Sequence, residues 1–420
     1  MELIPHARII VISQFFGADQ SSVGQFLADF ANGAAEAGHD VCVICGATGY
    51  APPDVAASVA NGGKDSIASS FSASGGRIHV VRIKTATFSQ SKPRKLLSYA
   101  TFFAGAAWRA LWIPRPNVVL TLTAPPGLGW IGWLIKKIRG CSHVCWEMDL
   151  YPDIAISLDI PVAAWTSWLL DFPRRTADRV IALGPCMKMR LLQHRIAQDR
   201  IVVAENWADG QAIAPQPFPI QPPLRILYSG NFGLAHDIAT IREVIVRLAN
   251  SPHFQFVFAG GGHARKALIE FCRERQISNV SFPGYAPLRD LGASLADCDV
   301  GLVTQKLETL GAVVPSKIYG LMAAGRPVLF IGPEAATPSL LIKRFDCGWQ
   351  MNCGDTDGLH SLLSRLRSDP EEIVLKGRNG RSAFLANYEK RDGVARVMQA
   401  LGVETTAARR NETVDLLLVG

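Results

Sequence analysis

An alternation of strand and helix patterns that stops and then starts again limits the fold more than any other feature of this sequence. The chain opens with the apolar run Arg8–Ser13, a loop, and an amphipathic segment over Val23–Ala37. Gly38-His39 end that helix, and the apolar run Val41–Cys45 follows directly. Two strands joined through a helix form a βαβ unit, in which the strands lie parallel. The sequence therefore predicts an α/β fold with a doubly wound parallel sheet.

A proline-rich stretch divides this alternation into two halves. Ala214–Pro223 has neither a hydrophobic period nor charge, which is typical of a linker in partly extended form. Within the first half, Ala47–Gly76 is rich in Ala, Gly and Ser and predicts a mobile excursion. Further strands are predicted at Ile78–Ile83, Val118–Leu122, His143–Trp146, Arg179–Ala182, Arg225–Ser229, Phe254–Ala259, Val280–Phe282, Val300–Val303 and Val328–Ile331.

The length of 420 residues also indicates two domains, because a single core stops growing at about 250–300 residues. We place the N-terminal domain at residues 1–208, the linker at 209–223 and the C-terminal domain at 224–385. Residues 386–420 predict a helix followed by a frayed tail. Ligands of such sheets bind beyond the carboxyl ends of the strands, so we expect the functional site in a cleft between the domains.

The net charge of +7 suits nucleic acid, an anionic membrane surface or phosphorylated substrates. Nucleic acid is the least favoured, because the basic residues are scattered rather than grouped in runs. The first apolar run begins only at Ile9 and resembles a strand, so we expect no cleavable signal and a cytoplasmic protein. Cys42 and Cys45 are three apart in a predicted strand and point to opposite faces, which favours buried thiols over metal or redox chemistry.

The segment Val314–Leu329 predicts a turn, a short helix and a buried strand. Pro315 suits the turn, Ser316 can cap the first helical turn, and Lys317 adds positive charge where the helix dipole already favours anions. Gly325 ends the helix. The segment is therefore either a phosphate site or an ordinary helix-to-strand connection.

Two glycine-containing turns strengthen the phosphate interpretation. Gly230–Asp237 follows one predicted strand, and Gly260-Gly261-Gly262 follows the next. Glycines allow backbone N–H groups to approach phosphates closely, although plain tight turns use them equally. Together with Pro315–Lys317, these turns place three loops at strand ends that face one crevice.

The order of these motifs resembles the retaining glycosyltransferases of the family 4 type, which have the two-domain GT-B fold. Within that family the chain is most similar to bacterial enzymes of surface-polysaccharide assembly, which often have a Pro-Ser-Lys turn and the phrase present here as Trp146–Asp153. The other motifs that carry the resemblance are Tyr228–Gly233, Phe258–Gly262, Phe282–Tyr285 and Asp297–Leu302.

The resemblance implies that the C-terminal domain binds a UDP- or GDP-sugar and the N-terminal domain an acceptor. Tyr285 and its neighbours would contact the nucleobase, and Ser316, Lys317 and Ile318 would hold the diphosphate. The other donor-binding residues implied by the family are Gly17, Gly230, Asn231, His236 and Gly261. The C-terminal helix would cross back to the N-terminal domain.

The chain departs from the family at its charged positions. Asn231 and His236 stand where Arg and Lys often reach the phosphates, so Lys317, with Arg326 or Lys306, would carry more of the charge. The paired glutamates of the family fall at Ala312 and Gly320, and Glu308 would substitute for the first. This loss leaves two alternatives open: altered donor contact, or a scaffold that no longer catalyses.

Asp149 is the candidate catalytic residue, because it follows a predicted strand and matches the acidic position of the family phrase. Its alternative role is a cap for the next segment, and Asp153 is the second candidate. In this family the donor phosphate is thought to receive the acceptor proton, so Asp149 would orient the acceptor or stabilise charge. The sequence contains no metal motif, and we expect neither metal nor cofactor.

Two segments, Leu96–Ile113 and Gly127–Ile138, combine apolar residues, tryptophans and basic flanks. Both are too short to span a membrane, which needs about 20 apolar residues. They are either buried helices or a helix pair at a membrane interface, with Trp130 and Trp133 as contacts. The second interpretation suits a polyprenyl-diphosphate-linked acceptor at the inner membrane face.

The sequence therefore predicts a transferase that moves a sugar to a lipid-linked saccharide. Two alternatives remain open. A nucleotide-sugar 2-epimerase shares the architecture but needs several acid/base groups in the cleft, of which few are at matching positions. A catalytically inactive partner subunit would keep the fold without the glutamates.

Overall fold

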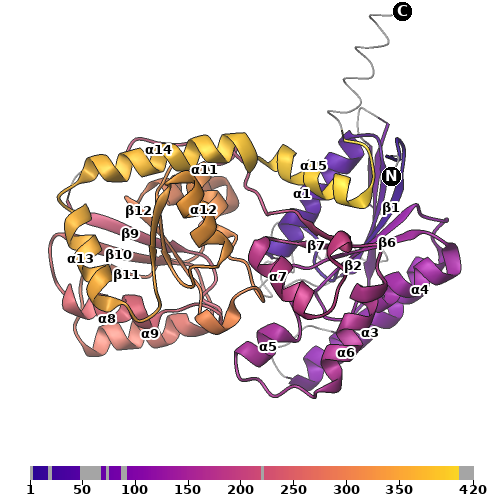
Figure 1. Cartoon of the computed structure of the whole chain (residues 1–420), viewed down its shortest axis with the longest axis horizontal. Helices are drawn as coiled ribbons and strands as arrows, with labels where there is room; N and C mark the ends of the chain where they lie inside the picture. The colour runs from indigo at the N-terminus through magenta and orange to yellow at the C-terminus, as the bar shows by residue number, and fades with distance from the viewer. Residues whose placement is uncertain are drawn as a thin grey trace, which may run out of the picture.

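The computed structural model describes residues 3–17, 21–47, 68–71, 75–86, 92–218 and 222–405. Figure 1 shows two α/β units side by side, each with its own sheet. The N-terminal sheet has the order β3-β4-β2-β1-β5-β6-β7-β8, and all neighbours are parallel except β3 and β4. Its strands are β1 (Arg8–Ile12), β2 (Asp40–Gly46), β3 (Ala68–Phe71), β4 (Arg77–Ile83), β5 (Val118–Leu122), β6 (Ser142–Trp146), β7 (Arg179–Ala182) and β8 (Ile201–Val203).

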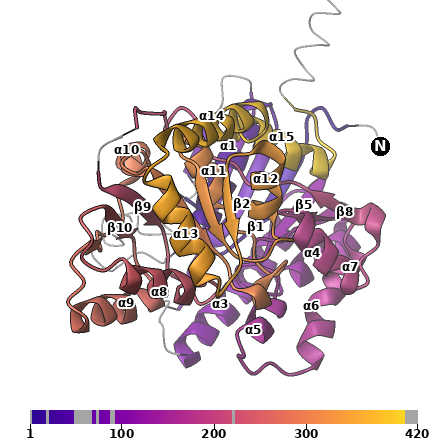
Figure 2. The same cartoon turned by 60° about the vertical axis from the view of Figure 1, so that its left-hand side comes forward.

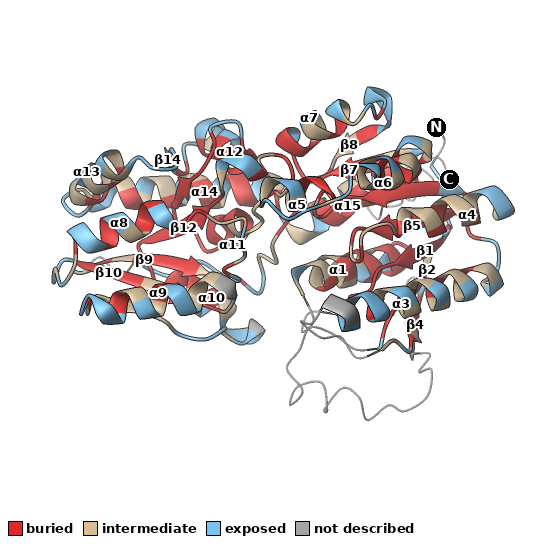
Figure 3. Ribbon diagram, turned by 90° about the horizontal axis from the view of Figure 1, so that it is seen from below, coloured by how far each residue is buried: buried red, intermediate tan, exposed pale blue. Residues whose placement is uncertain are grey.

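The C-terminal sheet is parallel throughout, in the order β11-β10-β9-β12-β13-β14. Its strands are β9 (Leu224–Ser229), β10 (Phe254–Ala259), β11 (Val280–Ser281), β12 (Val300–Thr304), β13 (Val328–Ile331) and β14 (Gly348–Met351). The central strands are apolar on both faces because helices cover both sides of the sheet (Figure 3). The prediction of two doubly wound domains is confirmed.

Helices connect the strands in both units. In the first unit they are α1 (Ser22–Glu36), α3 (Lys92–Trp112), α4 (Gly129–Arg139), α5 (Asp153–Ser157), α6 (Trp165–Thr176) and α7 (Pro185–Gln193). In the second unit they are α8 (Ala239–Arg247), α9 (His263–Glu274), α10 (Leu291–Ala296), α11 (Lys317–Ala323), α12 (Thr337–Phe345), α13 (Thr356–Leu366) and α14 (Pro370–Asn387). A last helix, α15 (Lys390–Leu401), leaves the second unit and packs against α1 of the first (Figures 1 and 2).

Part of the predicted mobile excursion is a strand. Ala68–Phe71 forms β3 and pairs antiparallel with β4, although its sequence has no apolar alternation that would predict a strand. Residues 48–67 and 72–74 of the excursion lie outside the described residues. The frayed tail was predicted from Thr405 onward; Thr405 itself is buried, and the rest of the tail lies outside the described residues. The sequence also missed the short strands β8 and β14, which pair with β7 and β13.

Cys42 and Cys45 lie in β2 as buried free thiols, as their spacing predicted. Burial raises the pKa of Cys42 to about 12 and that of Cys45 to about 11. Within the described ranges no group of His, Cys, Asp and Glu is placed to hold a metal ion. No helix of the described chain is long and apolar enough to cross a membrane.

The two units touch directly at the segment after β6. The Leu150 amide donates a hydrogen bond to the Ala312 carbonyl at 2.8 Å, and Asp149 forms an antiparallel bridge with Val313. Arg190 of α7 donates to the Leu310 carbonyl at 3.3 Å. The loop between β12 and α11 is therefore held by the N-terminal unit.

A chain of buried charges supports this contact. Arg174 lies between Glu147 (2.9 Å) and Asp171 (3.1 Å). His194 then joins Asp171 (2.7 Å) to Asp153 (3.0 Å), and Asp153 also accepts from Arg190 at 2.6 Å. Asp153, the second catalytic candidate, is thus tied into an ion-pair network. Although burial raises the pKa of Asp153, its hydrogen bonds from His194 and Arg190 outweigh that effect and lower it.

This network predicts a pH-dependent stability. Hydrogen bonds to Asp153 and then Asp171 raise the pKa of His194 to about 9, so its contribution is complete below the unfolded pKa of about 6.5 and is lost as the pH rises through about 9. We expect His194→Gln to remove stability of the order of 2 kcal/mol at pH 6.5, and much less above pH 9. Urea unfolding across pH 6–10 measures the difference.

The matched control is His253→Gln, because His253 is exposed and forms no ion pair within the described chain. Its unfolding curves should follow the wild type at every pH. An equal loss of stability for His194→Gln at pH 6.5 and pH 9.5 would contradict the protonated bridge.

Candidate functional site

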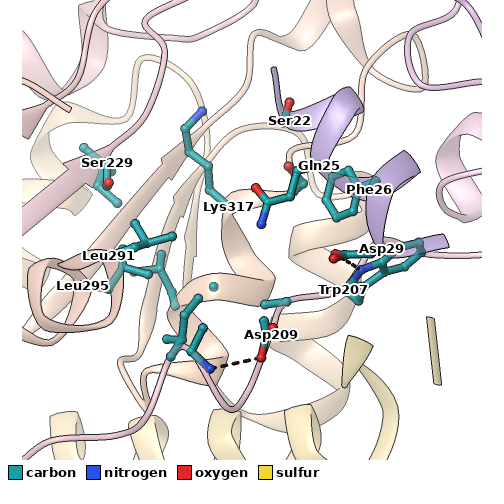
Figure 4. Close-up of a pocket in the computed structure, with 17 residues that line it drawn as sticks. Ser22, Gln25, Phe26, Asp29, Trp207, Asp209, Ser229, Leu291, Leu295 and Lys317 are labelled. Carbon is teal, nitrogen blue, oxygen red and sulfur yellow. Dashed lines mark hydrogen bonds between the residues drawn. The ribbon is translucent and has the colours of Figure 1, made fainter. Parts of the chain in front are cut away.

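A cavity of about 370 Å³ lies between the two units. One wall is a face of α1, and the other is the start of α11 with Ser229 at the end of β9 (Figure 4). The segment after β8, including Trp207 and Asp209, closes the third side, and Leu291 and Leu295 of α10 supply apolar surface. The volume falls in the range of small-molecule sites, about 300–1,000 Å³. The predicted cleft is therefore present at the strand ends.

The glycine turns after β9 and β10 lie against each other beside this cavity. Gly230 (φ +133°) and Gly260 (φ +122°) have backbones that favour glycine, and a Cβ on Gly260 would lie 2.2 Å from the Gly230 carbonyl oxygen. The Tyr285 ring covers the second turn, since a Cβ on Gly261 would lie 3.0 Å from it. The structure thus brings Gly230, Gly261 and Tyr285 together.

Lys317 is a cation without an acidic partner. Its Nζ lies 3.4 Å from His236 Nε2 and 5.0 Å from the centre of the Tyr228 ring. Among the residues that the structure describes, no carboxylate lies within ion-pair distance of this ammonium. Burial lowers the pKa of Lys317 to about 8. A buried charge that lacks its counterion is a suitable anchor for an anionic ligand.

His236 orients Lys317 rather than adding charge. Its Nδ1 lies 2.9 Å from the Thr304 carbonyl and must donate there, so the Nε2 lone pair faces Lys317. Burial, and then the neighbouring ammonium, lower the pKa of His236 to about 3. The imidazole is therefore neutral, and it accepts a hydrogen bond from Lys317.

Two predictions on the Val314–Leu329 segment are wrong. Ser316 precedes α11 but its hydroxyl makes no capping hydrogen bond; it lines the cavity instead. Arg326 is fully buried and donates to the carbonyls of Gln216, Pro217 and Ala296, so it holds the linker and carries no charge into the site. Arg326 follows the helix, and the proline-rich linker lies across that end.

The remaining donor candidates differ in their positions. Asn231 is exposed on the first glycine turn, and Gly17 (φ +110°) lies just before α1. The Ile318 side chain is fully buried, which leaves only its backbone for a ligand. Glu308 is exposed in the 3-10 turn Leu307–Thr309 and does not line the cavity, so the structure gives no support for it as the substitute glutamate.

The positions that match the family's glutamates are now defined. Ala312 is buried, and its carbonyl accepts the bond from Leu150. Gly320 lines the cavity, and a Cβ there would meet only Leu295, at 3.4 Å. The cavity therefore has room for a side chain at position 320, but glycine does not supply one.

Asp149 lies at the contact between the units, outside the lining of the cavity. Its amide donates to Thr123 Oγ1 at 3.3 Å, and its carboxylate has no hydrogen-bond partner within the described ranges. Burial, and then the charge of Glu147, raise the pKa of Asp149 to about 6. The carboxylate is thus available for chemistry near neutral pH.

Sequence reasoning missed the wall that α1 contributes. The residues of that wall are Ser22, Gln25, Phe26 and Asp29. Their i, i+3, i+4 and i+7 spacing places them on one helical face, and polar residues on such a face could have indicated an interface. Only the second unit, however, shows which face is covered.

Two family models match the chain in succession. The glycosyl transferase 4-like domain matches residues 22–207, and the glycosyl transferases group 1 domain matches residues 211–383. Together they cover most of the chain and meet at the linker.

Curated relatives match over similar lengths. WbjE of Pseudomonas aeruginosa, named as a probable glycosyltransferase, is 26% identical over 407 residues, covering 91% of this chain and 95% of its own. WcaI of Escherichia coli, named for colanic acid biosynthesis, is 25% identical over 344 residues, covering 76% of this chain and 81% of its own.

Solved structures share the fold. Sucrose-phosphate synthase from Thermosynechococcus elongatus has a TM-score of 0.73 at 16% identity and covers 94% of this chain and 98% of its own. HepE of Anabaena, solved with UDP-glucose, has a TM-score of 0.69 at 13% identity and covers 94% and 99%. The chain therefore belongs to the GT-B glycosyltransferases of the family 4 type, which pair a glycosyl transferase 4-like domain with a group 1 domain.

Proposed function

We propose that this glycosyltransferase moves a sugar, with retention, from a UDP- or GDP-sugar to a lipid-linked saccharide at the inner membrane face. The observation that carries the donor site is the ammonium of Lys317, which has no acidic partner among the described residues and lies beside the glycine turns of Gly230 and Gly261. The UDP-glucose bound by HepE supports the same class of donor, and the colanic acid name of WcaI supports a polysaccharide product.

In this proposal the donor diphosphate lies between Lys317 and the glycine turns. Backbone N–H groups at these turns and the ammonium stabilise the negative charge that develops as the nucleotide leaves. His236 keeps Lys317 directed towards the phosphates, and Tyr285 lies beside the nucleobase. The donor phosphate accepts the acceptor proton, and Asp149 stabilises the positive charge that develops on the sugar. The epimerase and inactive-subunit alternatives are not favoured by the family matches.

A membrane contact is proposed on the layer of α3, α4 and α6, in which α4 contacts both other helices. Trp130 and Trp133, the residues expected from the sequence, are half-buried and packed within the layer. Trp130 donates to the Leu169 carbonyl at 2.9 Å, and both rings pack on Phe172 of α6. The exposed tryptophans of the layer, with their exposed fractions, are Trp108 (63%), Trp112 (70%), Trp165 (65%) and Trp168 (60%). Exposed Arg94, Arg115 and Lys137 add positive charge for anionic headgroups.

The direct test of function is hydrolysis and transfer with a panel of UDP- and GDP-sugars. Release of free sugar or transfer from one donor identifies the base and the sugar. The anomeric configuration of the product, read by NMR, tests retention. Formation of an epimer without acceptor, or no turnover of any donor, would contradict the proposal.

Removal of the Lys317 ammonium should weaken nucleotide binding. We expect Lys317→Ala to reduce UDP or GDP affinity about 10- to 100-fold, because a charge-assisted hydrogen bond contributes about 1.5–3 kcal/mol. Wild-type affinity should also fall above about pH 8, where the free enzyme loses this charge, and the variant should lack that fall. Calorimetry measures both. Lys343→Ala, which removes an exposed lysine of α12, is the control.

Asp149→Asn should act on turnover and not on nucleotide affinity. We expect a fall in kcat of about 100-fold or more, as for loss of an electrostatic group at a reacting centre. Wild-type activity should fall below about pH 6, where the carboxylate is protonated. Asp159→Asn is the control, since Asp159 is exposed at φ +54°, where Asn is tolerated. Unchanged kcat in Asp149→Asn would remove Asp149 from the mechanism.

The exposed tryptophans should determine membrane binding. We expect wild type to float with anionic liposomes and Trp108→Ala/Trp112→Ala to remain largely in the soluble fraction. Leu375→Ala/Leu385→Ala, which removes exposed leucines from the other domain, should float like wild type. Wild type that stays with the soluble fraction would contradict the membrane contact.

A further inference from the structure

Helix α1 of the N-terminal domain contributes hydrogen-bonding groups to the donor cavity. Ser22, Gln25 and Asp29 lie on the face that lines the cavity, about one helical turn apart. Figure 4 shows the Gln25 amide extending from α1 towards Lys317. Within the described ranges this amide has no hydrogen-bond partner. Its donors and acceptor are therefore available to a molecule in the cavity.

The facing wall offers no equivalent groups at that level. Gly320 and Leu321 line the cavity one turn after Ser316 and Lys317. Gly320 has no side chain, and the adjacent Leu291 and Leu295 are apolar. A polar ligand that extends along α11 from Lys317 therefore meets side-chain hydrogen-bonding groups on the α1 wall and at Asp209.

Asp29 is positioned by a hydrogen bond to one of its two carboxylate oxygens. Its Oδ2 accepts a hydrogen bond from Trp207 Nε1 at 2.9 Å. Trp207 is itself fixed by an edge contact with Phe26 at 5.1 Å and by stacking on Trp146 at 6.1 Å. The second oxygen, Oδ1, forms no hydrogen bond within the described chain. Asp209 differs, because two backbone amides and Lys390 already occupy its carboxylate.

We propose that Asp29 and Gln25 bind vicinal hydroxyls of the donor, across the domain boundary, in the space that Gly320 leaves open. The inference rests on the donor site proposed above. A carboxylate accepts two O–H groups and an amide both donates and accepts, which is the combination that a diol requires. The hydroxyls belong either to the ribose or to the transferred sugar, since both are linked to the diphosphate at Lys317.

One consequence concerns specificity. A donor that contacts Lys317 on one domain and Asp29 on the other bridges the cleft. Its hydroxyls can make this contact only when the two walls of the cleft are close together. A donor that lacks the correct hydroxyls loses this contact and leaves one oxygen of the half-buried Asp29 carboxylate without a partner from the ligand.

The ribose arm of the test compares the affinities for UDP, 2′-deoxy-UDP and 3′-deoxy-UDP by calorimetry. If UDP does not bind, GDP and its two deoxy forms are compared instead. We expect wild type to prefer the full ribose about tenfold, which is the size of one hydrogen bond to a charged group. Asp29→Ala and Gln25→Ala should reduce this preference towards one. Asp29→Asn, which keeps an acceptor for Trp207, separates the contact from any effect on folding.

The sugar arm compares the affinity for the nucleoside diphosphate with the affinity for the corresponding nucleotide sugar. If the hydroxyls belong to the transferred sugar, Asp29→Ala weakens the nucleotide sugar about tenfold and leaves the nucleotide diphosphate unchanged. Wild-type ratios in both arms for Asp29→Ala, Asp29→Asn and Gln25→Ala would overturn the proposal.

Lys317→Ala keeps the two proposals distinguishable. This substitution should lower the affinities for the ribose and deoxyribose nucleotides by the same factor, so the ratio of the two affinities should not change. That result, together with unchanged ratios in the Asp29 variants, overturns only the diol contact. Wild type that binds no nucleotide at all would overturn the donor site as well.

Discussion

The contact between the two domains is the constraint on which the candidate site depends. The cavity has one wall on each domain, so its shape is set by how the segment after β6 meets the loop before α11. Backbone pairing of Asp149 and Leu150 with Ala312 and Val313 fixes that contact. The buried charges from Glu147 to Arg190 hold the N-terminal side of it. Because each of these charges has an oppositely charged partner, burying them at the contact does not leave an uncompensated charge.

The cavity also contains a positive charge that no acidic residue of the described chain balances. The N-terminal carboxylates near the contact are mostly paired, whereas Lys317 across the cleft has no acidic partner among the described residues. Its lowered pKa records the cost of keeping that charge out of water. An anionic ligand would offset the cost. Burial also raises the pKa of Asp149 at the domain contact, so burial shifts the pKa values of these two residues in opposite directions.

Local patterns predicted the fold well, because β-strands and the turns between them are specified by neighbouring residues. The strands β1, β2, β5, β6 and β7 follow the apolar runs within a residue or two. β3 was missed, since pairing with β4 and not its own composition makes it a strand. The position of Arg326 and the packing of Trp130 and Trp133 were missed for a related reason. Their partners lie on the linker and on α6, far away in the sequence.

The sequence by itself determined the alternating strands and helices, the glycines that the turns require, and the family through the order of its motifs. These properties depend on residues close together along the chain, whose backbone and packing preferences act locally. The tertiary structure decided which side chains share the cavity. Gln25 and Asp29 come to face Gly320 and Lys317 only because two separately folded sheets meet at one joint, and nothing in the local sequence specifies that meeting.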